Sequence, residues 1–432
     1  MKFIVDVDAD RFDAFAIACP WNHYSKTSRF PALQKAEFSE GHLLGVEDEN
    51  GNLLATAVLL LKKTKIPFGK FAYCQYGFNL NVENRELIHF FAASLRDFAR
   101  SQGAFFLRLD SNITRLEHTP DGKIVENGFN HEYVTTILQE EGYTHLGYNY
   151  GYSGNRMSRY TYRIDMHKPL AEVLKGIKRG FTLQNKNQLR DVRVRYGSRD
   201  ELSYLVDAED ALSHKLGFKP KDIAWFRRQW DCYAPFVHYY IVETNFHQAK
   251  QNLQKKIAEE AAHFELLKDE QKRKTVKKQI EAMRKEIVEI EQGGYDVDQT
   301  VVLGAKFILM MGENVWNVNM YTHKTLLNFR GAFALHRFAI EDLYQKGART
   351  YDFEGVSGSF DPHDAYYGLT DFKKSFGGDF LEFLGEFDAV LNRRKYRLWK
   401  HADHFNRAIR RRLYALLYRK KASGKTRDSI RL

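Results

Sequence analysis

Two adjacent lysines near the C-terminal end of the chain are the residues best placed to do chemistry. Lys373 and Lys374 follow Phe372 and precede a pair of glycines. Upstream, residues 351–353 lead into the glycine-containing segment 355–358, which predicts a strand that ends in a tight loop, because glycine adopts positive φ angles at little cost. Lysines beside a turn are often simply solvated. Between a strand loop and a glycine turn, they also suit a short element whose cations face a pocket.

Other familiar catalytic signatures are absent from the sequence. Segment 355–359 is not a nucleophile elbow, because Ser359 occupies the place of the second glycine. His401 and His404 lie in a strongly basic region, where they are expected on a helix surface rather than at a metal. Neither a Walker loop nor a Rossmann fingerprint occurs. We therefore expect neither a metal nor a nucleotide cofactor.

The composition indicates two domains without disulfides. A chain of 432 residues is longer than one core usually serves, and 44% hydrophobic residues are enough for two. Its three cysteines, Cys19, Cys74 and Cys232, are far apart, which fits a reducing compartment and argues against a structural zinc site. The longest apolar stretch, 53–61, is too short to span a membrane. We expect a cytoplasmic protein.

Positive charge is concentrated at the C-terminal end. Residues 392–432 contain fifteen Lys or Arg and two acidic residues, a net charge of +13, whereas the whole chain carries +11. Apolar residues recur there at helical spacing, at Trp399, Ala402, Phe405, Ile409, Leu413 and Leu416. This basic amphipathic tail suits peripheral contact with an anionic membrane. Equally, its apolar stripe could pack on the body while the arginines face solvent or tRNA.

A charged insertion predicts a helical arm. Residues 246–292 contain neither proline nor glycine. Their apolar residues alternate between steps of four and three, as in a coiled-coil seam: Leu253, Ile257, Ala261, Phe264, Leu267, Val276, Ile280, Met283, Ile287 and Ile290. Because both ends return to the same domain, we expect an antiparallel hairpin that turns near residues 269–274. A structural spacer and a tRNA-docking element are both compatible with it.

The segments on either side of this insertion follow a similar order. A predicted helix at 85–100 is followed by Gly103 and a strand that ends at Asp110, and a predicted helix at 331–345 is followed by Gly347 and a strand that ends at Glu354. This order predicts a remote duplication, with two copies of one fold facing each other.

The motifs, taken in order, resemble a known family. The chain has an opening MKF strand, Asn84-Arg-Glu-Leu-Ile-His-Phe-Phe before a helix, Leu107-Arg-Leu-Asp110, the charged insertion, and the closing segments YDFEGVSG and DFKKSFGG. Over almost the whole chain, this series resembles the Fem family of peptidoglycan interpeptide-bridge aminoacyltransferases.

The resemblance implies an α+β fold of two similar acetyltransferase-like (GNAT-fold) subdomains with an inserted antiparallel coiled-coil arm. The expected divisions are 1–155 with about 384–400, then 156–245 with 293–383, the arm 246–292, and the tail 392–432. The alternative enzyme class for this fold is a CoA-dependent N-acyltransferase. Segment 100–105 has Phe where a loop that binds the CoA pyrophosphate needs a small residue, which disfavours this alternative.

The resemblance also implies a reaction. An amino acid would pass from aminoacyl-tRNA to the stem-peptide amine of a lipid-linked or nucleotide-linked muropeptide precursor. Since the ester is already activated, aminoacyl-tRNA is a co-substrate and no cofactor is required. The alternatives are transfer to another amine, or a tRNA- or membrane-surface-binding protein without catalysis.

The site residues are carried over from the family motifs. Lys373 would stabilise the oxyanion, with Phe372 beside it. Substrate binding is assigned to Lys35, Lys221, Trp225 and Asp110. Two positions depart from the family. Lys221 stands where an arginine is expected, and lysine cannot make the two parallel hydrogen bonds of a guanidinium. Asn317-Val318 stands where a tyrosine pair is expected. These departures suggest altered diphosphate and stem-peptide contacts.

Overall fold

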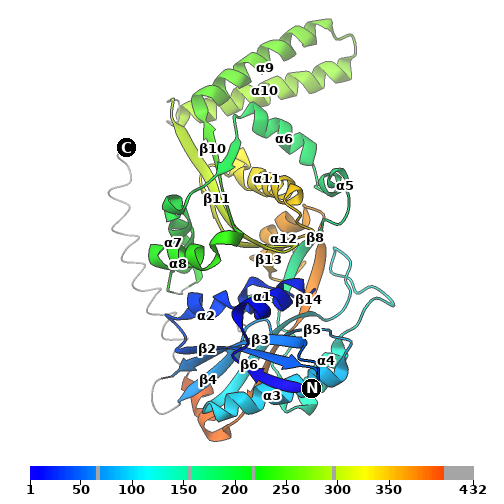
Figure 1. Cartoon of the computed structure of the whole chain (residues 1–432). Coiled ribbons are helices and arrows are strands. Elements are labelled where there is room, and N and C mark those ends of the chain that lie inside the picture. Colours follow the sequence, from blue (N-terminus) through cyan, green and yellow to red (C-terminus); the bar gives the residue numbers. More distant parts are fainter. Residues whose placement is uncertain (65–68, 153–156, 217–218, 294–297, 403–432) are drawn as a thin grey trace.

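The computed structural model describes residues 1–64, 69–152, 157–216, 219–293 and 298–402. In this part of the chain, fourteen strands form one mixed sheet, twelve of them in the order β1-β2-β3-β4-β6-β14-β8-β13-β12-β11-β10-β9, with β5 beside β3 and β7 beside β14. Helices cover both halves of the sheet (Figure 1).

The first half begins with an antiparallel series of strands and ends with a helical crossover. Its elements are β1 (Lys2–Val5), α1 (Ala9–Ala18), η1 (Tyr24–Lys26), α2 (Arg29–Gln34), β2 (Glu40–Glu47), β3 (Leu53–Lys63), β4 (Lys70–Cys74), β5 (Asn79–Leu80), α3 (Arg85–Ser101), β6 (Ala104–Thr114), α4 (Glu132–Glu140) and β7 (Tyr143–His145).

The second half contains the inserted helices and the closing strand. Its elements are β8 (Tyr160–Asp165), α5 (Leu170–Lys175), α6 (Gly180–Leu189), β9 (Arg193–Tyr196), η2 (Arg199–Glu201), α7 (Ser203–Leu216), α8 (Ile223–Tyr233), η3 (Ala234–Phe236), β10 (Val237–Asn245), α9 (Phe246–Leu266), α10 (Glu270–Gln292), β11 (Thr300–Met311), β12 (Asn314–Thr322), η4 (Leu327–Phe329), α11 (Gly331–Gln345), β13 (Thr350–Val356), α12 (Tyr367–Lys374) and β14 (Asp379–Val390).

The two halves repeat one topology. The pairs β1·β2, β2·β3 and β3·β4 are antiparallel, and α3 leads to β6, which is parallel to β4. The pairs β9·β10, β10·β11 and β11·β12 are likewise antiparallel, and α11 leads to β13, which is parallel to β12. Helices α1 and α2 lie between β1 and β2 in the chain, just as α7 and α8 lie between β9 and β10.

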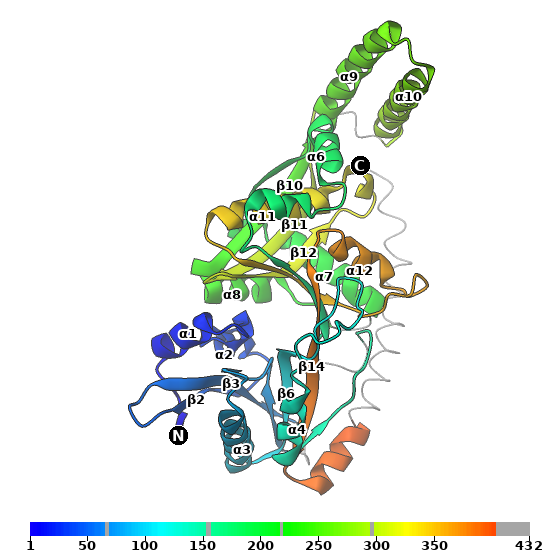
Figure 2. The ribbon, with the colours of Figure 1, turned by 90° about the vertical axis from the view of Figure 1, so that its right-hand side faces the viewer.

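Strand β14 joins the halves. Its residues 379–382 pair with β8, and its residues 383–390 pair with β6, so one strand belongs to both sides of the sheet. The register shifts between Phe383 and Gly385, where Gly385 has φ +87° and lies against the Arg159 side chain. Such a bulge bends the strand, and β14 runs from the upper to the lower half (Figure 2).

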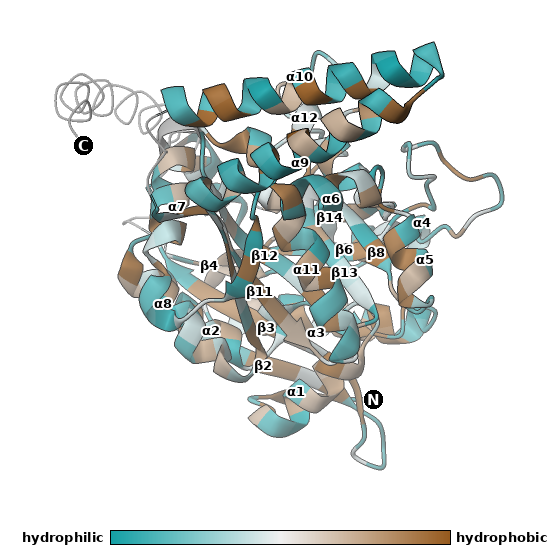
Figure 3. Cartoon of the chain, turned by 90° about the horizontal axis from the view of Figure 1, so that it is seen from above, coloured by the Kyte–Doolittle hydropathy of each residue, from teal (hydrophilic) through white to brown (hydrophobic). Residues whose placement is uncertain are grey.

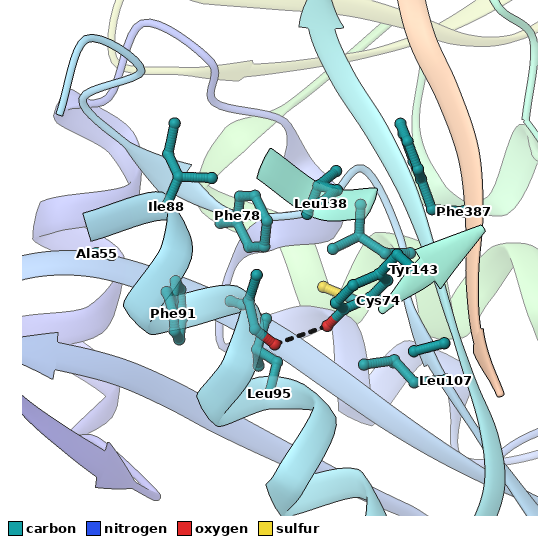
Figure 4. Packing of buried hydrophobic residues seen from close by; sticks show 14 of the residues in the cluster. Ala55, Cys74, Phe78, Ile88, Phe91, Leu95, Leu107, Leu138, Tyr143 and Phe387 are labelled. Carbon is teal, nitrogen blue, oxygen red and sulfur yellow. Dashed lines mark hydrogen bonds between the residues drawn. The ribbon is translucent and has the colours of Figure 1, made fainter. Parts of the chain in front are cut away.

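Three hydrophobic cores hold the molecule together. One lies between α3, α4 and the first half of the sheet, where the Tyr143 hydroxyl donates a 2.8 Å hydrogen bond to the Ala92 carbonyl (Figure 4). A second lies beneath α11. The third combines Phe30 of α2 and Phe226 of α8 with sheet residues such as Trp316, so the halves share a core at their interface.

The proline-free insertion forms two helices that lie side by side and project from the second half (Figures 1 and 2). Their outer surface is largely hydrophilic (Figure 3). Leu253, Val276, Ile280 and Ile290 are buried, but Ala261 is exposed, so its predicted place in the seam is wrong. The turn covers 267–269, earlier than predicted, because the Asp269 side chain caps α10.

The described start of the C-terminal tail packs on the first half. Residues 393–402 are helical, and the Trp399 ring lies 4.6 Å from the Phe106 ring between centroids. The remainder of the predicted amphipathic tail, including Phe405 to Leu416, lies outside the described residues. No helix in the described ranges is long and apolar enough to cross a bilayer.

Candidate active site

A bulged turn within β13, between Asp352 and Gly355, meets the C-terminal turn of α12 at Lys373. Its Nζ donates 2.8 Å hydrogen bonds to the carbonyls of Glu354 and Gly355. Glu354 has φ +60°, a left-handed conformation that is uncommon outside glycine and is often maintained at functional sites. The turn therefore holds the ammonium with two bonds and leaves the third N–H for another acceptor.

Strand β13 also supplies a buried carboxylate that fixes this turn. Asp352 accepts hydrogen bonds from the Glu354 backbone N–H at 2.7 Å and from Thr161 Oγ1 at 2.5 Å. Its second oxygen accepts two bonds from the Arg163 guanidinium, at 3.1 and 3.0 Å. Thr161 and Arg163 both come from β8, so the pairing of β13 with β8 positions the turn.

The first half contributes a histidine to the same place. His23 Nε2 lies 3.3 Å from Glu354 Oε1. Its other nitrogen, Nδ1, accepts from the Ser25 backbone N–H at 3.1 Å, so Nε2 carries the ring hydrogen and donates to the carboxylate. Three aromatic rings, those of Tyr24, Tyr76 and Trp316, pack around His23.

These groups border a narrow cavity at the junction of the halves. It is lined by His23, Tyr76 and Asn112 from the first half, by Ser158, Tyr160, Thr161, Arg163, Trp316, Asp352, Glu354 and Gly355 from the second, and by Phe383 of β14. Its volume of about 10 Å³ is room for roughly one water molecule. A substrate group can therefore enter only if the lining side chains move.

Burial shifts the acid–base behaviour of the cluster. Loss of hydration lowers the pKa of Lys373 to about 8, against the opposing attraction of Glu354 and Asp352. Burial, with the charge of Asp352, raises the pKa of Glu354 well above that of an ordinary glutamate, although Lys373 and Arg163 oppose it. Burial and the charge of Lys26 lower the pKa of His23, so its ring is neutral. Burial thus disfavours the charged forms of both Glu354 and Lys373.

A second buried lysine supports the cavity wall. Lys26 Nζ donates to Asn112 Oδ1 at 2.8 Å and to the Phe78 carbonyl at 3.1 Å. Burial lowers the pKa of Lys26 to about 7. Lys26 itself is completely buried, so its role is to orient Asn112, which lines the cavity.

Of the residues predicted to be catalytic, Lys373 does not line this cavity but bonds to the carbonyls of Glu354 and Gly355, which do, and Phe372 points into a core. The Phe372 ring packs against His336 and Phe376, with centroids 5.6 and 5.3 Å apart. The neighbouring Lys374 instead forms an ion pair with Asp121. The three side chains thus point in different directions from one short helix.

The residues predicted to bind substrate lie in two other places. Lys35 is exposed at the C-terminal end of α2, and α2 packs against α8. Lys221 and Trp225 lie at the start of α8, with Lys221 Nζ 4.0 Å from the centre of the Trp225 ring. The structure therefore places these three residues on one pair of packed helices. Helix α2 of the first half and helix α8 of the second half occupy equivalent positions in the repeated topology. None of them lines the narrow cavity.

Asp110 and Asn317 are buried in the sheet. The Tyr73 hydroxyl lies 3.5 Å from Asp110 Oδ2, and Asp110 does not line the cavity. Asn317 Nδ2 donates to the Asp352 carbonyl at 2.5 Å. Asn317, at a position where the resemblance led us to expect a tyrosine, therefore braces the site strand and does not line the cavity.

Sequence reasoning missed His23 and Glu354. Glu354 stands inside the motif that marks the site, and the only local signal was a charged residue directly before the first glycine of the loop. His23 comes from a loop near the N-terminus and has no such signal. Within the described part of the chain, no cluster of three or more His, Cys, Asp or Glu side chains is arranged to hold a metal ion.

Taken together, the fold and the site define a two-lobed α/β protein with an ammonium, a carboxyl and a neutral imidazole at the junction, groups suited to acyl transfer. The chain belongs to the FemAB family, whose model matches residues 7–404.

Two similar proteins and one solved structure cover nearly the same length. Aminoacyltransferase FemA of Staphylococcus aureus (strain MRSA252) is 25% identical over 414 residues, covering 92% of this chain and 97% of that protein. Aminoacyltransferase FemA of Staphylococcus epidermidis is 23% identical, covering 93% and 98%. The crystal structure of FemX has a TM-score of 0.69 at 20% identity, covering 92% of this chain and 99% of that one, which shows a shared fold.

Proposed function

We propose that this protein is an aminoacyltransferase that moves an amino acid from aminoacyl-tRNA to the stem-peptide amine of a peptidoglycan precursor. The observation that carries the proposal is membership of the FemAB family over residues 7–404, together with the Lys373 ammonium, which is held by the carbonyls of two residues that line a cavity at the junction of the halves. The reaction needs no cofactor, because the aminoacyl ester is already activated. We further propose that the protein acts in the cytoplasm.

In the proposed reaction, the amine nitrogen attacks the ester carbonyl carbon. A C–N bond forms and the carbonyl electrons move to oxygen; the tetrahedral intermediate then collapses, re-forms the carbonyl and releases the ribose oxygen, which takes up a proton. Lys373 has one N–H not used by the two carbonyls that hold it, and this N–H would donate to the oxyanion. Its charge favours the intermediate over the neutral ester.

Glu354 is suited to take the proton that the amine must lose. Its raised pKa brings its proton affinity closer to that of an amine than an ordinary carboxylate achieves, so transfer to it is less uphill. The Nε2–H of His23 holds one oxygen of the carboxylate and leaves the other available. His23 is thus a positioning residue.

We assign precursor binding to the α2–α8 pair. Lys35 and Lys221 place two cations on helices that pack together, which suits a phosphate-bearing precursor, with Trp225 beside them. Because Asn317 braces Asp352 rather than facing the cavity, stem-peptide contacts would differ from those of a protein with tyrosine there. A different acceptor amine is the alternative that this departure supports.

We also propose that each half is an acetyltransferase-like unit and that the arm is a coiled coil. The repeated strand order and the helical crossovers α3 and α11 support the first assignment. The buried Leu253, Val276, Ile280 and Ile290 support the second.

The test is transfer of radiolabelled amino acid from charged tRNA pools to synthetic precursors. Lipid-linked and nucleotide-linked muropeptides are supplied separately, and products are identified by mass. A product with one added amino acid on the stem-peptide amine is expected. Labelling of another amine would redirect the acceptor assignment, and binding of tRNA without transfer to any amine would refute catalysis.

A further inference from the structure

A large cavity lies away from the candidate active site, at the base of the arm. Its volume is about 530 Å³, and it is an open groove between α6, α10 and the turn before α11. One face of α6 provides Arg179, Leu183, Lys186 and Arg190, at helical spacing. The opposite wall comes from Lys285, Glu286 and Glu289 of α10, and the floor from buried residues such as Phe246 and Phe329.

The charge of this groove is positive and incompletely neutralised. Arg190 is paired with Glu286, with Nη2 2.9 Å from Oε2, and also donates to the Asn328 carbonyl. By contrast, the exposed Arg179, Lys186 and Arg330 have no acidic partner among the residues that the structure describes. Outside the C-terminal tail the chain carries a net charge of −2, so this concentration is not a general property of the body.

The groove continues toward Lys373. Arg179 and Thr182 also line a second hollow at the N-terminal end of α6, of about 420 Å³, together with Lys175, Phe181 and Arg337. Phe181 is 76% exposed, whereas the Arg337 side chain is 15% exposed and its Nε has no hydrogen-bond partner. The segment between α5 and α6 then contacts the end of α12, where the Lys178 backbone N–H donates to the Ser375 carbonyl at 2.7 Å.

We propose that this path, from the groove at the arm to the hollow at Phe181, binds the single-stranded end of tRNA that carries the amino acid. The inference rests on the proposed function and names the surface that the tRNA occupies. Arg179, Lys186 and Arg330 contact successive phosphates, and Phe181 stacks on one base.

The chemistry favours a single nucleic-acid strand. Cations in a row along a groove follow a phosphate backbone, and an exposed aromatic ring stacks on any base without reading its identity. Arg179 and Lys186 are separated by seven residues, about 10 Å along a helix axis. The described lining has no exposed ring other than Phe181, so binding is expected to depend weakly on base sequence.

The experiment measures binding of uncharged tRNA by the full-length chain as a function of salt. The double variant Arg179→Glu/Lys186→Glu is expected to bind at least tenfold more weakly, with a log–log salt slope smaller by about two because two phosphate contacts are lost. Phe181→Ala is expected to weaken binding without changing the slope. The double variant Lys2→Glu/Lys63→Glu and the single variant Phe129→Ala, in the first half, are matched controls for charge and for an exposed ring, and both should bind as the unmodified chain does.

Precursor binding and circular dichroism are measured on the same variants. Normal tRNA affinity and slope in the double variant would overturn the inference, as would equal losses in the two control variants. If the unmodified chain binds tRNA through the path but transfers nothing, the proposed function fails while the binding surface stands. If the unmodified chain transfers the amino acid and the double variant binds tRNA and transfers equally well, the proposed tRNA surface is wrong while the proposed function stands.

Discussion

At the scale of single residues, the candidate site depends on a few groups brought together from distant parts of the chain. Lys373 was predicted, because it stands in a family motif and beside glycine turns. Glu354 and His23 were not predicted, because their contact joins residues 331 positions apart and exists only once the halves meet. The predicted role of Phe372 stays a prediction, and its ring packs in the core of the second half.

Replacing Lys373 by methionine should slow single-turnover transfer about a hundredfold, since loss of one oxyanion donor costs on the order of 3 kcal/mol. Affinities for tRNA and precursor should change little, because the cation interacts most strongly with the transition state. Lys374→Met is the control, since Lys374 is paired with Asp121 instead. A large effect of Lys374→Met with a normal Lys373→Met would reverse the two assignments.

The rate of transfer should have a narrow optimum in pH. It rises as Glu354 loses its proton, at higher pH than an ordinary glutamate because burial raises the pKa of Glu354. It falls as Lys373 loses its own proton, with a pKa of about 8. Glu354→Gln should remove the rising limb and slow transfer about a hundredfold. Single-turnover rates from pH 5.5 to 9.5 measure both limbs, and an unchanged rising limb in the variant would exclude Glu354 as the proton acceptor.

At the scale of elements, the base of the arm is fixed by one arginine. Arg190, at the end of α6, binds Glu286 of α10 and the carbonyl of Asn328 next to α11, so three elements meet at a single guanidinium. The apolar period predicted the helices of the arm, but no sequence pattern indicated this anchor. Ala261, which was predicted in the seam, is exposed, whereas Phe264 and Leu267, nearer the tip of the arm, are half-buried.

Arg190→Ala should therefore destabilise the second half by about 1–3 kcal/mol, because the partly buried Glu286 carboxylate loses its partner. Denaturant unfolding measures the difference. Arg284→Ala removes an exposed arginine of α10 that has no acidic partner among the described residues, and it should change stability by less than about 0.5 kcal/mol. Equal effects of the two substitutions would show that the anchor contributes no specific stability.

At the scale of the whole molecule, the C-terminal tail dominates the net charge. Removing residues 403–432 should weaken binding to anionic vesicles or to tRNA and flatten the salt dependence of that binding. The reason is that ten of the fifteen Lys and Arg residues of segment 392–432 lie in the removed part. Vesicle co-sedimentation and tRNA titration at several salt concentrations distinguish the two partners. Unchanged affinities and salt slopes for both would limit the tail to packing, as Trp399 already does on the first half.

The duplication was predictable from the repeated order of helix, glycine and strand. The sharing of β14 between the two halves was not predictable. The sequence of residues 380–387 does not reveal that the two ends of this strand belong to different halves. That division depends on the bulge at Gly385 and on Arg159, which packs against it.

A chain that ends at residue 378 should fail to form either half, whereas one that ends at residue 402 should fold. The shorter chain leaves β6 and β8 with unpaired edges and removes Phe380, Leu384 and Phe387 from the cores. Thermal unfolding followed by circular dichroism compares them. A cooperative transition in the shorter chain would show that a half is stable without the shared strand.

The position of β14 also has a consequence for synthesis. A ribosome produces the first half early, at residues 1–145, yet the strand that completes its sheet is among the last segments to leave the exit tunnel. Domains usually fold as they emerge, N-terminal first. The first half, however, keeps an unpaired sheet edge while more than two hundred further residues are translated. We therefore expect its nascent form to bind chaperones that shield exposed strands.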